Sequence, residues 1–130
     1  MPSAPGRQLL RGAPYFPVSD VERAADYYLS VLGFEREYWA PPFFAIVSRD
    51  GQAIMLRSVP DPTRISPNEG QGGTWDAFFW VQDARALHAE MAGRGAETVY
   101  APVVQNEYRM LEFAVRDREG YVLGFGEALR

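Results

Sequence analysis

The feature that most constrains this chain is an internal repeat. The segment FAIVSRDG, residues 44–51, returns as FAVRDREG, residues 113–120, at a distance of 69 positions. Each copy is an apolar stretch followed by a charged pair that ends in glycine, which is the pattern of a β-strand leading into a hairpin turn. A repeat of this kind indicates two copies of one structural unit.

The composition is that of an ordinary globular protein. The chain has 130 residues, of which 47% are hydrophobic and 23% are charged, which is typical of one domain with a real core. It has no cysteine and one histidine, so disulfides, thiolate metal sites and histidine-rich metal sites are not expected. A net charge of −4 does not favour nucleic acid as a partner. No segment has the form of a signal peptide or a membrane span, which predicts a cytoplasmic protein.

The first half, about residues 10–60, predicts the order β-α-β-β-β. Ser19-Asp20-Val21-Glu22 has the form of a helix capping box, and Gly33 is a natural helix stop. Asp50-Gly51 is a strong hairpin signal. The predicted elements are a strand over 13–18, a helix from Asp20 to Gly33, and strands over 34–39, 43–49 and 52–58.

The second half, about residues 74–127, repeats this order after a linker over residues 60–73 that is rich in proline and glycine. The predicted elements are a strand over 75–81, a helix from Asp83 to Gly93, and strands over 96–101, 108–116 and 121–126. The repeat spacing requires about six more residues in this half, and we expect the segment Pro102–Glu107 to supply them as a loop. The whole chain, residues 1–130, is thus predicted to be a single α+β domain of two βαβββ modules.

Two segments carry a family resemblance. PVSDVERAADYYLSVLGFE, residues 17–35, followed by LEFAVRDREGYVLGF, residues 111–125, resembles the vicinal oxygen chelate superfamily of glyoxalase I, extradiol dioxygenases and bleomycin-resistance proteins. The resemblance covers roughly residues 10–127. It implies a curved mixed sheet around a ligand cleft, with the helices on the convex side. It also implies a homodimer, because many members build their clefts from both chains.

The resemblance also implies where metal ligands would lie. Metal-dependent members place one ligand on the first and one on the last strand of each module, and the corresponding residues here are Ala13, Met55, Asp76 and Gly124. Asp76 alone cannot hold a divalent metal. We therefore expect no metal and no other cofactor, which is closest in character to the bleomycin-resistance branch.

If these four positions mark the concave face, strand alternation predicts the lining of the cleft. Phe113 and Val115 are expected to pack against the helix, since they align with Phe44 and Ile46. Ala45, Ala53 and Ala114 are then expected on the cleft side together with the larger residues. Trp39 is expected to overhang the cleft. The predicted ligand-binding residues are Tyr15, Trp39, Phe43, Met55, Arg57, Asp76, Phe78, Trp80, Tyr108, Met110 and Glu112.

Two of these residues are also candidate catalytic groups. Glu112 lies between apolar neighbours in the middle of a strand, where an unpaired charge would be costly, so it either faces a ligand or pairs with Arg109 or Arg116. Asp76 either faces a ligand or bonds only to neighbouring backbone or to Arg57.

Three functions are compatible with these observations. The first is metal-free binding or sequestration of a flat aromatic small molecule, such as an antibiotic, with a positive charge suited to the two acids. The second is a metal-free isomerase or lyase in which Glu112 or Asp76 is the general base. The third is a metal-dependent lyase or dioxygenase, which the missing ligands disfavour. We favour the first.

Overall fold

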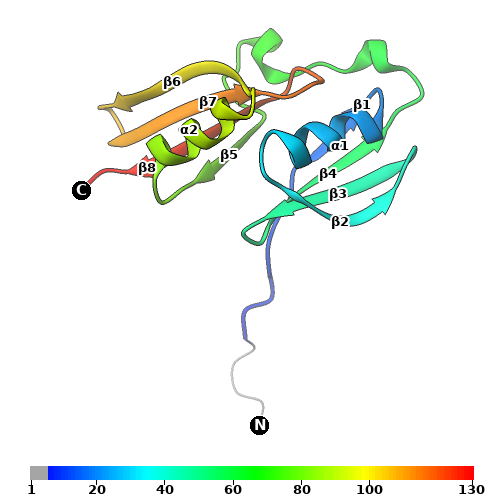
Figure 1. The fold of residues 1–130 in the computed structure, drawn as a ribbon, viewed down its shortest axis with the longest axis horizontal. Helices are drawn as coiled ribbons and strands as arrows, with labels where there is room; N and C mark the ends of the chain where they lie inside the picture. The colour runs from blue at the N-terminus through cyan, green and yellow to red at the C-terminus, as the bar shows by residue number, and fades with distance from the viewer. Residues whose placement is uncertain (1–5) are drawn as a thin grey trace.

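A computed structural model of the chain describes residues 6–130 and shows two modules side by side (Figure 1). Module one has the elements β1 (Tyr15–Val18), α1 (Val21–Ser30), β2 (Glu35–Ala40), β3 (Phe44–Arg49) and β4 (Gln52–Ser58). Its four strands form a sheet in the order β1-β4-β3-β2. The β1–β4 pair is parallel and the other two pairs are antiparallel.

Module two repeats this plan with β5 (Ala77–Trp80), α2 (Ala84–Gly93), β6 (Glu97–Gln105), β7 (Met110–Arg116) and β8 (Val122–Ala128), in the sheet order β5-β8-β7-β6. The linker between the modules carries two short 3-10 helices, η1 (Pro62–Arg64) and η2 (Asn68–Gln71). The predicted α+β fold of two βαβββ modules is confirmed, with the strands hydrogen-bonded as two four-stranded mixed sheets. Within residues 6–130, no helix is long and apolar enough to cross a membrane.

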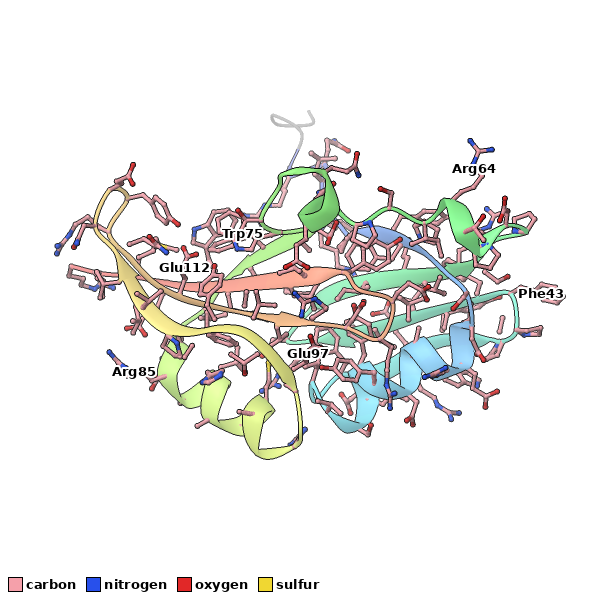
Figure 2. All side chains as sticks on the ribbon, turned by 90° about the horizontal axis from the view of Figure 1, so that it is seen from above. Phe43, Arg64, Trp75, Arg85, Glu97 and Glu112 are labelled. Atoms are coloured by element: carbon pink, nitrogen blue, oxygen red, sulfur yellow. The ribbon has the colours of Figure 1, made fainter. Side chains whose placement is uncertain are left out.

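Each helix starts at an aspartate and covers one face of its own sheet. The Asp20 carboxylate accepts a hydrogen bond from the Arg23 amide at 3.0 Å, and Asp83 accepts one from the Ala86 amide at 3.0 Å. Both helices lie on the same side of the two sheets (Figure 2). We call the opposite side of the sheets the open face.

The two β-hairpins that carry the sequence repeat differ by one residue. Four residues separate the paired Ser48 and Ala53, whereas five separate the paired Arg116 and Val122. The extra residue belongs to the β7–β8 turn, in which the Asp117 carboxylate accepts three backbone N–H groups. The hydrogen-bonded register therefore matches Phe113 with Ala45 of module one, and not with Phe44.

This shift corrects one part of the predicted cleft lining, because a slip of one residue moves a side chain to the other face of a sheet. Ala45 was expected on the cleft side, but it is fully buried in the core with Val47, on the helix side. Phe113 and Val115 do pack in the core, as predicted. However, the residues with which they were aligned, Phe44 and Ile46, lie on the open face.

The predicted loop over Pro102–Glu107 is also corrected. Strand β6 continues to Gln105, and the turn into β7 is shorter than expected. Two irregularities in the β6–β7 register, between Thr98 and Tyr100 and between Tyr100 and Val103, each take up one extra residue of β6. The additional length of this half therefore lies mainly in a longer β6–β7 hairpin with its bulges, and one further residue lies in the β7–β8 turn.

The modules are joined by side chains that cross between them and share one core. The buried Tyr28 hydroxyl of α1 donates a hydrogen bond at 2.6 Å to Asp117 in the β7–β8 turn. The Tyr121 hydroxyl donates at 2.6 Å to the Pro17 carbonyl, and its ring stacks on Phe16 at 4.2 Å. These contacts place the open faces of the two sheets in one fixed arrangement.

Asp117 makes this junction sensitive to pH. The side chain is 5% exposed, and burial raises the pKa of Asp117 from 3.8 to about 6, against the hydrogen bonds from Tyr28 and three backbone amides, which lower it. Because the folded-state pKa is raised, the protonated form is favoured in the folded protein. The stability that the folded protein gains from protonated Asp117 is complete below pH 3.8 and is lost as the pH rises through about 6.

We expect Asp117→Asn to remove this pH dependence, since an asparagine oxygen can still accept the backbone bonds and the side chain cannot ionise. The free energy of unfolding of the parent protein, relative to Asp117→Asn, should fall by up to ~3 kcal/mol between pH 4 and pH 7. Urea denaturation of both proteins across this range measures it. Asp50→Asn, at an exposed turn position, is the control and should follow the parent. Parallel curves for the parent and Asp117→Asn would contradict this interpretation.

Candidate functional site

Two glycines on the open face of β8 leave space that aromatic rings fill. A Cβ atom at Gly124 would lie 2.6 Å from Trp75 Cδ1 and 2.7 Å from Phe78 Cδ1. A Cβ atom at Gly126 would lie 2.6 Å from both Phe78 Cζ and Met110 Cε. No side chain fits at either position without displacing these groups, so the rings lie directly on the backbone of β8.

The rings around the two glycines are in contact with one another. The ring centroids of Trp75 and Phe78 are 4.6 Å apart, and those of Phe78 and Trp80 are 5.3 Å apart. Trp80 is the outermost of the three, with 76% of its surface exposed. We call the set that covers the open face of module two the aromatic layer; its members are Trp75, Phe78, Trp80, Tyr100, Tyr108 and Met110.

Glu112 lies buried beside this layer. It pairs with Gly126 across β7 and β8 and is 1% exposed. The Tyr108 hydroxyl donates to Glu112 Oε1 at 2.6 Å, and the Tyr100 hydroxyl donates to Oε2. Trp75 Nε1 donates in turn to the Tyr100 oxygen at 2.9 Å. A buried carboxylate is costly unless it is hydrogen-bonded, and here both of its oxygens have a donor.

The two tyrosines remain hydrogen-bond donors at neutral pH. Desolvation and the hydrogen bond to Glu112 raise the pKa of Tyr108 to about 12. Desolvation, and after it the hydrogen bond to Glu112, also raises the pKa of Tyr100. Neither hydroxyl is therefore a base near neutral pH. In Figure 2, Trp75 and Glu112 lie on the side of the sheet away from α2.

A groove of about 800 Å³ runs between the modules along β5, from Phe78 and Trp80 of the aromatic layer to Leu87 and Met91 of α2 on the helix side. One wall is the segment 76–83, which contains β5, the edge strand of its sheet. The opposite wall comes from module one, from residues 12–14 and the β3–β4 turn. Phe78 and Trp80 line this groove, whereas Glu112 does not. The size of the groove is that of a site for a drug-sized molecule.

Asp76 also lines this groove, but its carboxylate is occupied. Oδ1 accepts the Asn68 amide and Oδ2 accepts the Val122 amide, both at 2.8 Å. These bonds fasten the linker to the start of β8. Asp76 thus bonds to backbone, as one of the two alternatives from the sequence has it, while it also lines the groove.

The residues at the four implied metal-ligand positions do not fit a metal. The space beside Gly124 is filled by rings, Ala13 has no donor side chain, and both Asp76 oxygens accept backbone amides. Met55 offers a thioether, a soft ligand that does not suit the hard divalent ions, and it stands there without a second donor side chain. In residues 6–130, no group of three or more His, Cys, Asp or Glu side chains is arranged to hold a metal ion.

The candidate residues of module one gather in a separate place. Tyr15, Phe43 and Arg57 line a second hollow of about 540 Å³, which shares no lining residue with the groove. Met55 is half-buried on the same open face. The predicted single cleft therefore appears in one chain as two separate hollows, one in module one and one beside module two.

Trp39 is on the other side of the sheet from the position expected. It pairs with Ala45 across β2 and β3 and packs against the core, with the Arg36 guanidinium 3.8 Å from its ring centre. A register irregularity between Arg36 and Tyr38 changes the alternation along β2, so that Tyr38 faces the open side in its place.

Sequence reasoning missed Trp75 and Tyr100. Alternation from Asp76 assigns Trp75 to the helix side, but β5 begins only at Ala77, so alternation does not apply to Trp75. Tyr100 lies between the two irregularities of β6. The glycines at 124 and 126 were a usable signal, because glycine inside a strand often marks a place where another group approaches the backbone closely.

Comparisons with known proteins agree on one family of folds. A family model described as Glyoxalase/Bleomycin resistance protein/Dioxygenase superfamily matches residues 12–125. No curated protein sequence matches the chain.

Solved structures with similar folds include the following three. TioX from Micromonospora sp. ML1 is 24% identical, with a TM-score of 0.71 over 92% of this chain and 98% of that one. A bleomycin-binding protein from bleomycin-producing Streptomyces verticillus, complexed with copper(II)-bleomycin, is 25% identical, with a TM-score of 0.69 over 95% and 99%. TnmS3, an antibiotic-binding protein from Streptomyces sp. CB03234, is 21% identical, with a TM-score of 0.70 over 97% and 100%.

The glycine positions generate a prediction about the aromatic layer. We expect Gly124→Ala to displace the Trp75 and Phe78 rings, because a methyl group cannot be placed beside them without movement. It should lower the free energy of unfolding by about 1–3 kcal/mol and reduce the near-UV circular dichroism. Gly93→Ala is the control, since its Cβ meets nothing within 4 Å and alanine suits a helix. Unchanged stability and spectrum in Gly124→Ala would refute the packing described above.

Proposed function

The chain belongs to the Glyoxalase/Bleomycin resistance protein/Dioxygenase superfamily, and we propose that it binds and sequesters a flat, aromatic, cationic small molecule such as an antibiotic, without a metal. The observation that carries this proposal is Trp80, a tryptophan 76% exposed to solvent at the edge of a groove of about 800 Å³. Indole in this position is a surface on which a flat ring can stack.

The aromatic layer gives such a ligand more than one surface. Phe78 supports Trp80 in an edge-to-face contact, with an interplanar angle of 80°. Tyr108 is half exposed on the same open face. A cation held against such rings gains from their negative faces, at about 0.5–1 kcal/mol for an exposed ring and more when water is excluded.

Glu112 supplies a negative charge that attracts a cationic ligand. Its carboxylate is buried beside the layer, with a hydroxyl donor on each oxygen. Buried surroundings screen a charge less than water does, so a carboxylate here favours a cation on the neighbouring rings without direct contact.

One relative of similar fold supports an antibiotic as the ligand. It is a bleomycin-binding protein that shares 25% identity with this chain. The antibiotic-binding protein TnmS3 supports the fold alone, at 21% identity. We infer from the first relative the class of ligand, not its identity.

The alternative function, a metal-free enzyme with Glu112 or Asp76 as general base, has less support. A general base must reach the proton that it removes. The oxygens of Asp76 accept two backbone amides, and those of Glu112 accept two tyrosine hydroxyls. A substrate would have to displace one of these donors before either carboxylate could take a proton.

We expect Trp80→Ala to weaken binding of a flat aromatic cation by about 1–2 kcal/mol, the sum of lost stacking and cation–π attraction. A thermal-shift screen of flat cationic antibiotics, with proflavine as the reference cation, finds the ligands, and calorimetry measures their affinity. Tyr38→Ala is the control, since Tyr38 is similarly exposed but belongs to module one. Equal affinity in Trp80→Ala and the parent, or an equal loss in Tyr38→Ala, would show that the ligand is elsewhere.

We also propose that the protein works as a homodimer. Large aromatic side chains stay exposed in a single chain, at Tyr15, Tyr38, Phe43, Trp80 and Tyr108. In the described part of the chain, β1 and β5 each pair on one side only. Exposed aromatic surface and unpaired strand edges both favour association.

Light scattering at micromolar concentration tests the dimer. The expected mass is about twice the 14.6 kDa of one chain. A mass of 14.6 kDa at these concentrations would contradict a dimer and would leave a groove built from one chain only.

A further inference from the structure

Within residues 6–130, hydrogen bonds and ion pairs join the two modules at two places. One is an ion pair between Arg49, at the end of β3, and Glu90 of α2. The other lies where α1 and β1 meet β6, β7 and the β7–β8 turn, and we call it the tyrosine junction; its members are Tyr27, Tyr28, Tyr121 and the hydrogen-bonded pair Ser19 and Glu119. In the same residues, no backbone-to-backbone hydrogen bond joins the modules.

The Arg49–Glu90 ion pair has two hydrogen bonds. Arg49 Nη1 donates to Glu90 Oε2 at 2.8 Å, and Nη2 donates to Oε1 at 2.9 Å. Nη1 also donates to the Leu32 carbonyl at 2.8 Å, which orients the guanidinium from its own module. A guanidinium that binds both oxygens of a carboxylate is the strongest geometry for such a pair.

Gly33 allows the charged groups of both modules to converge. Its φ is +78°, and a Cβ atom there would lie 2.6 Å from Arg49 Nη1, 2.9 Å from Arg94 Nη1 and 3.0 Å from Glu90 Oε2. The guanidinium of Arg49 comes from module one, and the other two groups come from α2 of module two. They therefore pack against the same backbone, at a position where a side chain would meet all three.

Glu90 also keeps two positive charges from facing each other alone. Arg94, one helical turn further along α2, has Nη2 at 3.7 Å from the Glu90 Oε2 that Arg49 also contacts. If the charge of Glu90 were removed, arginines of opposite modules would remain next to each other without a counter-ion. The contact between the modules would then change from attraction to repulsion.

The ion pair lies where the groove reaches the helix side of the sheets. Arg49 lines the groove, and so do Leu87 and Met91, which lie near Glu90 on α2. No member of the tyrosine junction lines the groove. The two connections between the modules are thus separate, and the groove can widen at the ion pair while the tyrosine junction still holds the modules together.

We propose that the Arg49–Glu90 ion pair is a latch, which keeps the groove closed at its helix-side end. When the ion pair breaks, module two turns about the tyrosine junction and the groove opens toward the helices. With the latch closed, the modules have the arrangement described above. This inference goes beyond the proposed function, since it concerns a motion of the protein alone and does not depend on which molecule the groove takes.

The test uses the absence of cysteine from the chain, because a single introduced thiol then reports the opening. Met91 is buried on the groove wall, so the thiol of Met91→Cys should react with the neutral reagent N-ethylmaleimide when the groove opens. We expect Glu90→Gln to raise this labelling rate about three- to five-fold, as for the loss of an ion pair. Phe34→Cys, on the opposite wall, is a second probe and should respond in the same way.

Salt distinguishes a latch from a general loosening of the fold. Screening weakens both the attraction of Arg49 to Glu90 and the repulsion between Arg49 and Arg94. Added sodium chloride should therefore speed the labelling of Met91→Cys when residue 90 is glutamate and slow it when residue 90 is glutamine. The further change Arg94→Gln should remove most of the salt dependence that Glu90→Gln shows.

Two controls make the result specific. Val115→Cys is buried in the core of module two and does not line the groove, so it measures unfolding, and Glu90→Gln should leave its labelling rate unchanged. Glu97→Gln removes an ion pair with Arg116 that lies within module two, and should leave Met91→Cys labelling unchanged. Met91→Cys labelling that Glu90→Gln does not accelerate, or an equal acceleration of Val115→Cys, or an equal effect of Glu97→Gln, would overturn the inference.

Discussion

The site depends on one constraint, which is that residues 124 and 126 are glycines and have no side chain. Because rings can lie directly on the backbone of β8, Trp75 and Phe78 pack where an ordinary strand would present its own side chains. Trp75 then reaches Tyr100, and Tyr100 reaches Glu112, so that the acid is buried and fully hydrogen-bonded. Any larger residue at either glycine would push this layer off the sheet.

The position of this layer is set by the junction between the modules. Tyr28 and Tyr121 are large side chains that cross from one module to the other and end on buried or backbone acceptors. They join the two sheets through one core, which fixes the groove beside β5. The duplicated plan therefore gives two similar open faces, and the residues placed on them have diverged in charge and size.

The fold could be predicted from the sequence, because strand, helix and turn signals occur twice in the same order. The site could be predicted only in part. Alternation placed Phe78, Trp80 and Glu112 on the open face, since the irregularities of module two lie in β6 and none lies in β5 or β7 themselves. It failed for Ala45 because the Asp117 turn holds one extra residue, and for Trp39 because β2 contains an irregularity. A period-2 argument holds only while every residue of a strand is paired, and bulges are local events that composition does not reveal.

The account rests on the claim that a flat cation binds on the aromatic layer beside Glu112, and Glu112→Gln tests this claim most directly. Glutamine keeps the shape of the side chain but removes its charge. Calorimetry with proflavine should show binding weakened by about 1–2 kcal/mol, the attraction between unit charges ~8–16 Å apart at an effective dielectric constant of about 20. Glu22→Gln, an exposed change on α1, should bind as the parent does. Proflavine affinity in Glu112→Gln equal to that of the parent would contradict the account.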